Sequence, residues 1–301
     1  MIQSPRLIPG RTNAIALGLL FPTLLLLLMF GPGTHGITFA VATIAFSILG
    51  FTAYCFLHEA EHELLFESRF LNDGAGVMLG LFFPAPFHLL RQGHLGHHAR
   101  NRTDTEAFDL YHPNRPREKW MRRFQLYGTL TGIWYLVVVL SNVLAFTWPL
   151  PLLFRRTDRS ASALLSSFNP EKIGIVRLEA LLALLFHGTL LWLSDSPGFY
   201  LLMYFFSGLL WSSQQYLHHY GTERHPERGA RNVRTWKFLD LLWLNHNLHL
   251  THHLKPSLPW IHLRLNGPPA TTTMMSAYWQ MWRGPVADTS TVMDVTEGRV
   301  V

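Results

Sequence analysis

The stretch Asn245-His246-Asn247-Leu248-His249-Leu250-Thr251-His252-His253 holds four histidines in nine positions. His249, His252 and His253 have the spacing i, i+3 and i+4, which places side chains on one face of an α-helix. Three imidazoles are therefore expected to converge on one point. Neutral imidazole is the commonest protein metal ligand, and it suits iron, zinc, copper and nickel. The stretch predicts a metal site carried by a helix.

Two other segments repeat this kind of spacing. His94-x-x-His97-His98 has the same arrangement, and His58-x-x-x-His62 has the i, i+4 spacing of one helix face. A lone histidine is usually a core or surface group. This chain has 17 histidines in 301 residues, and the three motifs together hold eight of them. The clustering indicates one shared metal site.

The composition indicates a membrane protein. Hydrophobic residues make up 49% of the chain, more than a typical soluble domain contains. The net charge of +6 does not favour nucleic-acid binding, because the basic residues flank apolar segments and do not form a separate basic domain. They fit a membrane protein that faces anionic lipid on its cytoplasmic side. The single cysteine, Cys55, excludes an internal disulfide framework and is expected to be buried.

Four apolar runs are long enough to cross a bilayer. They cover residues 13–31, 37–57, 175–193 and 199–217. Short turns join the first two runs and the last two, so we expect two hairpins. The expected fold is all-α and integral to the membrane, with a re-entrant or in-plane segment and a cytoplasmic helical cap that carries the histidines. It forms a single domain over residues 1–284, followed by a C-terminal tail at 285–301.

The basic residues predict the orientation of the hairpins. Lys and Arg concentrate on the cytoplasmic side of membrane proteins. The two tight turns, 32–36 and 194–198, contain none. Both turns should therefore point outward, with both chain termini in the cytoplasm. The expected ligands then share one cytoplasmic face: His58, His62, His94, His97, His98, His219, His249, His252 and His253.

Two more apolar segments do not fit a simple span. Residues 74–90 are broken by Pro84 and Pro86, so we interpret them as interfacial or buried beside the site. Residues 127–154 must begin and end on the cytoplasmic side, and they are too short to cross twice as helices. We expect a re-entrant or in-plane helix pair, bent near Ser141–Asn142 or at the prolines that follow. The alternative is a fifth span.

Nine clustered nitrogens exceed the needs of one ion. A single zinc takes four ligands, of which three are protein groups in a catalytic site. Two iron ions that keep open coordination positions can use nine nitrogen ligands. Ligation rich in histidine is unlike the Glu-x-x-His pattern of soluble di-iron bundles.

The motifs resemble those of the membrane-bound fatty acid desaturase and hydroxylase superfamily, which includes alkane hydroxylases and carotenoid hydroxylases and ketolases. The matching segments are His58-Glu-Ala-Glu-His62, His94-Leu-Gly-His97-His98, His249-Leu-Thr-His252-His253 and the following Leu254-Lys-Pro-Ser-Leu-Pro-Trp260. Gln215-Tyr-Leu-His-His-Tyr-Gly221 is similar to the Asn-Tyr-Val-Glu-His-Tyr-Gly stretch of alkane hydroxylases. Gln215 stands at the Asn position, His218 at the Glu position and His219 at the ligand position. The resemblance covers residues 50–262.

The resemblance implies a di-iron centre that uses dioxygen as co-substrate. The implied reaction is desaturation of an acyl or other lipid-like chain, free or bound to a carrier. The alternative is hydroxylation of an alkyl, fatty acyl or carotenoid substrate. Electrons must come from an external donor of the ferredoxin, rubredoxin or cytochrome b5 type with its reductase, because the sequence carries no flavin, haem or iron–sulfur motif. No catalytic residue is expected beyond the metal centre.

Groups around the ligands should hold each imidazole in one tautomer. The expected residues are Gln215, Glu61, Asp240, Asn245, His218 and His246, and Glu61 and Asp240 are the preferred pair. We expect His218 and His246 to lie beside the ligands but to turn away. Two other classes of protein stay open, a metal transporter or sensor and an intramembrane zinc hydrolase. The location of the expected ligands at the ends of the spans disfavours a transporter. Metal analysis would separate them.

Overall fold

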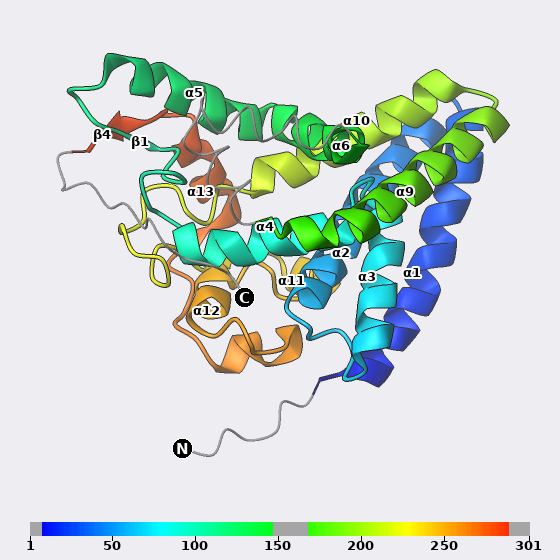
Figure 1. Cartoon of the computed structure of the whole chain (residues 1–301), viewed down its shortest axis with the longest axis horizontal. Coiled ribbons are helices and arrows are strands. Elements are labelled where there is room, and N and C mark those ends of the chain that lie inside the picture. Colours follow the sequence, from blue (N-terminus) through cyan, green and yellow to red (C-terminus); the bar gives the residue numbers. More distant parts are fainter. Residues whose placement is uncertain (1–7, 147–167, 289–301) are drawn as a thin grey trace.

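A computed structural model describes residues 8–146 and 168–288, and helices dominate it (Figure 1). The longer helices are α1 (Gly10–Phe30), α2 (Gly36–Glu61), α3 (Arg69–Phe82), α4 (Phe87–Arg100), α5 (Pro116–Leu130), α6 (Ile133–Phe146), α9 (Ile173–Leu193) and α10 (Pro197–Gln214). The shorter helices are α11 (Lys237–Leu242), α12 (His249–Leu254) and α13 (Met274–Met281). Three 3-10 helices, η1 (Gly31–Gly33), η3 (Pro170–Lys172) and η4 (Trp260–Leu265), complete the helical elements of the described residues. The all-α fold expected from the sequence is confirmed.

In the described part of the chain, three helical segments are long and apolar enough to cross a membrane: Gly10–Gly33, Gly36–Glu61 and Pro170–Leu193. They correspond to three of the four expected spans. The fourth corresponds to α10, which ends at Gln214 and not at Leu217, and it does not meet the same criterion of length and apolar content. α10 still packs closely on α2, where the Phe46 and Tyr204 rings are 5.0 Å apart. Helices α9 and α10 form a hairpin beside α1 and α2 (Figure 1).

The expected break at Pro84 and Pro86 separates α3 from α4, which meet at an angle of 99°. A broken helix leaves carbonyl groups without partners, and in an apolar environment each must be satisfied. His187 Nε2 lies 2.8 Å from Leu81 O, and the Tyr204 hydroxyl donates to Phe82 O at 3.3 Å. Asn142 Nδ2 donates to Pro84 O at 2.5 Å. Three other helices therefore stabilise the break.

The segment 127–154 is bent, but not near Ser141–Asn142, the first of the two expected positions. Helices α5 and α6 meet at 88° around Thr131–Gly132, and α6 continues without a break through Ser141–Asn142. Gly132 has φ +83°, a conformation that glycine adopts without strain and that commonly ends a helix. If each bent pair counts as one span, residues 8–146 and 168–288 contain up to five. The prolines at 149 and 151 lie outside the described residues.

Two short parallel strand pairs tie the loops together. Strand β1 (Leu110–Tyr111) pairs with β4 (Val286–Ala287), and β2 (Val233–Arg234) pairs with β3 (Thr272–Thr273). The β1–β4 pair corrects the expectation of a loose tail from residue 285. Val286 N donates to Asp109 O at 2.8 Å, so the tail is hydrogen-bonded where it begins. The remainder of the expected tail, residues 289–301, lies outside the described part of the chain.

Candidate metal centre

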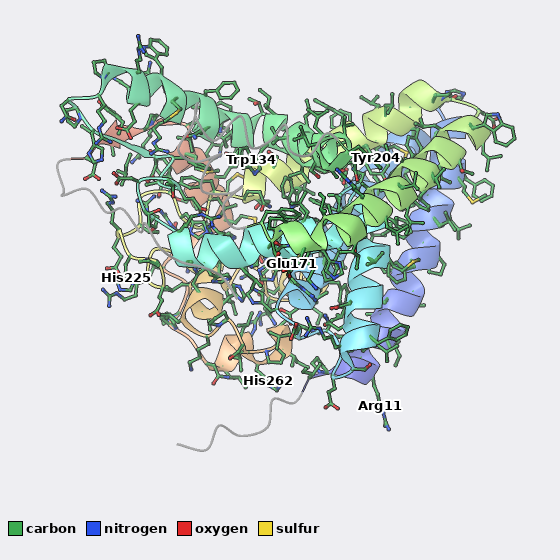
Figure 2. The ribbon with its side chains drawn as sticks, in the orientation of Figure 1. Arg11, Trp134, Glu171, Tyr204, His225 and His262 are labelled. Atoms are coloured by element: carbon green, nitrogen blue, oxygen red, sulfur yellow. The ribbon has the colours of Figure 1, made fainter. Side chains whose placement is uncertain are left out.

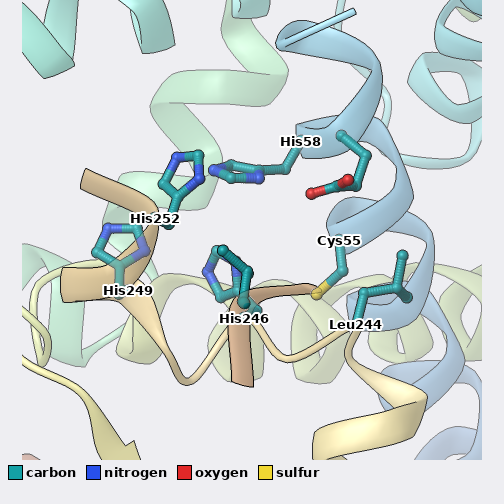
Figure 3. Close-up of a pocket in the computed structure, with 8 residues that line it drawn as sticks. Cys55, His58, Leu244, His246, His249 and His252 are labelled. Carbon is teal, nitrogen blue, oxygen red and sulfur yellow. The ribbon is translucent and has the colours of Figure 1, made fainter. Parts of the chain in front are cut away.

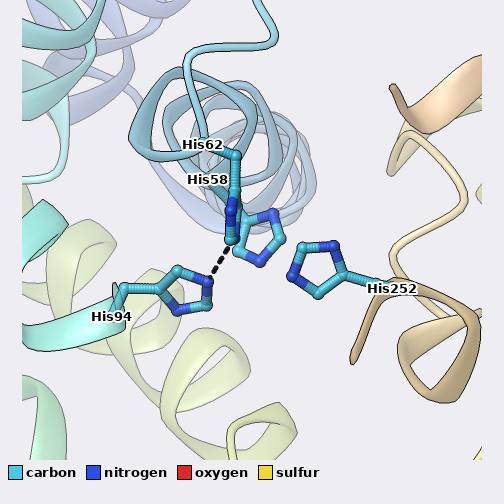
Figure 4. Close-up of side chains that lie close together, drawn as sticks. All are labelled: His58, His62, His94 and His252. Atoms are coloured by element: carbon cyan, nitrogen blue, oxygen red, sulfur yellow. Dashed lines mark hydrogen bonds between the residues drawn. The ribbon is translucent and has the colours of Figure 1, made fainter. Parts of the chain in front are cut away.

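The nine expected ligands lie together and form two groups. His58, His62, His94 and His252 form the first, and His97, His219, His249 and His253 form the second. Within each group the potential ligand atoms all lie within 4.8 Å of one another. His98 Nε2 is 3.1 Å from His94 Nε2 and 3.0 Å from His252 Nε2, so it joins the first group. Figure 4 shows four rings of the first group pointing at a common centre.

The two triple-histidine motifs do not each converge on one point, contrary to the expectation. On α4, His94 and His98 face the first group while His97 faces the second. On α12 the division is reversed, because His249 and His253 face the second group and His252 faces the first. Residues i and i+4 are about 40° apart around a helix, whereas i+3 and i+4 are about 100° apart. A helix that lies between the two groups can therefore contribute histidines to both of them.

The other ligands come from helix ends. His58 lies in the last turn of α2 and His62 immediately follows that helix. His219 lies in the turns after α10, where its Nδ1 is 2.9 Å from Gly229 O. A carbonyl oxygen can only accept, so Nδ1 carries the proton and Nε2 is left to face His249 Nε2 at 3.1 Å. The fold thus fixes this tautomer.

A carboxylate orients one ligand in the second group. His97 Nδ1 is 2.6 Å from Glu106 Oε2, and Arg100 Nε donates to the other oxygen of Glu106 at 2.8 Å. Such carboxylate–histidine pairs hold metal-binding imidazoles in position. The sequence did not single out Glu106. The available signal was its place as the first glutamate after the His94–His98 motif.

A family comparison now bears on this site. A model of the family described as "Fatty acid desaturase" matches residues 15–284. The chain belongs to the fatty acid desaturase family. It is also 27% identical over 250 residues to a Sorghum bicolor protein called "Probable fatty acid desaturase DES1". That match covers 73% of this chain and 58% of the relative, so the chain spans only part of the relative's length. The fatty acid desaturases are dioxygen-dependent oxidoreductases.

The two preferred orienting carboxylates of this fatty acid desaturase family member differ in their surroundings. Glu61 Oε2 is buried and lies 4.0 Å from His94 Nδ1, close to the first group. Asp240 instead accepts hydrogen bonds from Thr235 and Arg264. Asp240 therefore pairs with Thr235 and Arg264, whereas a histidine ligand was expected as its partner. Its position at the start of α11 explains this, because the side chain holds the loops on either side of that helix.

The other expected residues lie around the site in several roles. The Tyr54 hydroxyl donates to Gln215 Oε1 at 3.1 Å, and Asn245 Nδ2 donates to Trp260 O at 3.1 Å. These bonds hold the segments that carry His219 and His249. Asp109 acts in the same region, where it accepts from Gly221 N at 2.6 Å and from the Tyr216 hydroxyl.

His218 and His246 lie beside the expected ligands, and neither belongs to the two four-histidine groups. The His246 ring is 5.1 Å from that of His58, and the His218 ring is 4.8 Å from that of His249. Burial lowers the pKa of His218 to about 3 and that of His246 to about 4, so both are neutral near pH 7. Figure 3 shows His246 beside a small cavity. The cavity is lined by Cys55, His58, Glu59, Leu244, His246, His249, His252 and Leu263.

Other histidines lie apart from the two groups. Figure 2 shows His225 and His262 at the edge of the molecule. His187, in the middle of α9, bonds the Tyr200 hydroxyl at 2.6 Å through Nδ1 and Leu81 O through Nε2, so it joins neighbouring helices. His112 is buried, with Nε2 3.1 Å from Asp104 Oδ2.

The donor set fits metal ions. His58 Nε2 and His249 Nδ1 are buried in the described structure without a hydrogen-bond partner, and buried polar atoms of this kind are costly. Facing nitrogens such as His62 Nε2 and His94 Nε2, 2.8 Å apart, can share only one proton. Burial also lowers the pKa of His249, His252 and His253, which keeps their lone pairs available to a metal.

Proposed function

We propose that this chain is a membrane-bound di-iron oxidoreductase that uses dioxygen to desaturate an acyl or other lipid-like chain. Two four-histidine groups, in a chain of the fatty acid desaturase family, carry the proposal. Each group brings together histidines from several helices and helix ends. Iron is one of the metals that neutral imidazole suits. The nine histidines would hold two ions, with His98 completing the first group.

The residues of the chain prepare the site for this chemistry. When bound, the two irons supply dioxygen activation and the removal of hydrogen from an unactivated C–H bond. Glu106 and Gly229 O fix the rings of His97 and His219. The lining of the small cavity beside the first group includes two apolar side chains, Leu244 and Leu263. The surrounding buried helices exclude water from the reacting centre.

The proposal includes partners and an orientation. Electrons would come from an external donor of the ferredoxin, rubredoxin or cytochrome b5 type with its reductase. The substrate would be lipid-like, consistent with a site built at the ends of membrane helices. We place the histidine groups and both termini on the cytoplasmic side, because the turns 32–36 and 194–198 contain no Lys or Arg.

Product analysis tests the reaction. The purified chain is loaded with iron and given a reductase system, labelled dioxygen and candidate acyl substrates, and the products are measured by mass spectrometry. We expect an alkene that has lost two hydrogens and carries no labelled oxygen. The His252→Ala variant is the matched control and should give no product. An alcohol with labelled oxygen as the main product would contradict desaturation and leave the site assignment unchanged.

Hydroxylation is the second candidate, and the stretch Gln215–Gly221 favours it because of its similarity to alkane hydroxylases. A desaturase must hold two adjacent C–H bonds near the oxidant, whereas a hydroxylase needs one within reach. A misplacement of about 1 Å can alter a rate roughly 100-fold, so small differences in the cavity decide the outcome.

Metal analysis separates the remaining classes. The segment His58-Glu-Ala-Glu-His62 also matches the His-Glu-x-x-His motif of zinc hydrolases. In this structure both histidines belong to a four-histidine group, and Glu59 Oε2 accepts a hydrogen bond from Trp260 N at 3.0 Å. We expect two irons per chain. One zinc per chain would support a hydrolase, and an exchangeable ion a transporter or sensor.

A further inference from the structure

The short helix α11 exposes an apolar face next to the metal centre. Trp236, Phe238 and Leu241 have exposed fractions of 72%, 62% and 67%. The Trp236 and Phe238 rings stack with their centroids 5.9 Å apart. Contiguous apolar surface of this kind marks an interaction with a protein, a ligand or a membrane. No membrane span is predicted here, because the surrounding residues are polar.

The contacts of α11 place it at the depth of a membrane helix. Trp243, directly after α11, donates from Nε1 to Ile48 O at 3.4 Å, and its ring lies 4.8 Å from that of Phe51. Ile48 is near the middle of α2, about 18 Å along the helix from Gly36 at 1.5 Å per residue. Figure 1 shows α11 beside α2. The helix therefore lies level with a segment that is long and apolar enough to cross a bilayer.

The surface of α2 leads directly to α11. Ile37, Val41 and Ile44 are exposed, and their spacing places them on one face of the helix. Ile48 is the next position on this face, and it is the residue that Trp243 contacts. The exposed face of α2 thus ends at the turn on which Trp243, the residue after α11, packs.

The charges of α11 also suit a lipid interface. Its one acidic residue, Asp240, is buried and paired with Arg264. Arg234 and Lys237 are exposed at its N-terminal end. Aromatic side chains flanked by basic residues are typical of the boundary between the hydrocarbon core and the lipid phosphates. No carboxylate of this helix is left to repel anionic lipid.

We propose that α11 is immersed in the membrane leaflet nearest the histidine groups, with Trp236, Phe238 and Leu241 in contact with lipid. Arg234 and Lys237 then lie near the lipid phosphates. Leu244, which follows α11, lines the cavity beside His58 and His249. The segment therefore brings the histidine cavity close to the hydrocarbon layer. This inference depends on membrane insertion and is independent of the reaction that the site performs.

Spin-label accessibility tests the depth. In a Cys55→Ala background, Phe238→Cys and Leu241→Cys carry a nitroxide label in phosphatidylcholine nanodiscs. Ile44→Cys is the lipid-facing reference, and Glu227→Cys, which is exposed in a polar loop, is the water-facing reference. Collision rates with dioxygen and with a water-soluble nickel chelate are measured. We expect the labels at 238 and 241 to match Ile44→Cys, with nickel collisions several-fold lower than at 227. Nickel collisions equal to those at 227 would overturn the proposal.

A second measurement needs no substitution. A photoactivated diazirine that partitions into the bilayer labels lipid-facing residues of the unmodified chain in the same nanodiscs. We expect labelling of the peptide that contains residues 236–242 to a level comparable to that of the peptide containing 37–44. The peptide with residues 223–228 should stay unlabelled. Absence of label from 236–242, with 37–44 labelled, would overturn the inference even if the cysteine variants fail to fold.

Discussion

His97 Nδ1 and Glu106 Oε2 lie 2.6 Å apart, and this contact links α4 to the loop that follows it. We expect Glu106→Gln to weaken iron binding 10- to 100-fold, the range found when such outer partners are changed. The amide keeps an acceptor but loses the charge that fixes the ring. Iron retained per chain after dialysis against a chelator measures the effect. The matched control is Glu223→Gln, at an exposed ion pair, and equal retention in the two variants would contradict the role of Glu106.

The two histidine groups predict the effect of single ligand substitutions. His252 faces the first group and His253 the second, although they are neighbours in the sequence. His252→Ala and His253→Ala should each lower the iron content and abolish turnover. His225→Ala, at the edge of the molecule, should retain both. Full activity in two or more alanine variants of the nine ligands would show that the nine-ligand site is wrong.

The break between α3 and α4 predicts a structural role for His187. His187→Phe keeps the ring volume but leaves Leu81 O without its donor in an apolar environment. We expect a loss of about 1–3 kcal/mol in the free energy of unfolding. Thermal unfolding in detergent measures it. His35→Phe, at an exposed position, is the control and should change little. Equal midpoints for the two variants would mean that the carbonyl finds another partner.

The proposed orientation can be measured with single cysteines. In a Cys55→Ala background, Ser196→Cys lies in the turn between α9 and α10, and Glu227→Cys lies near the histidine groups. A membrane-impermeant maleimide added to intact cells should label position 196 only. Position 227 should react after permeabilisation. The reverse pattern would place the histidine groups outside the cytoplasm.

The sequence predicted the elements better than their arrangement. The apolar runs and the i, i+4 pair His58–His62 identify α2 and the position of its ligands, because both depend on local periodicity. Likewise, Pro84 and Pro86 are visible signals of a break. The bend at Gly132 was missed because a single glycine does not distinguish a bend from a helix interior. The true bend depends on packing, since Gly132 lies against Leu209 of α10.

The division of the ligands into two groups could not be predicted from spacing. Spacing shows that His94, His97 and His98 share a face of the helix. It does not show whether that face points at one metal site or lies between two. The division depends on where α12 lies relative to α4, which is a tertiary relationship. The role of Asp240 shows the same limit. Asp240 was expected to orient a histidine, whereas Arg264 pairs with it in the folded chain.

The interleaving of α4 and α12 has a consequence for how the protein is made. Each group needs histidines from α2 or the turn after α10, from α4 and from α12, so neither can exist in a partly synthesised chain. Chains emerge from the ribosome N-terminus first. His58 and His62 must therefore wait, at the end of an already inserted helix, until α12 has been translated and has folded back. Iron delivery is thus expected only after α12 has been translated.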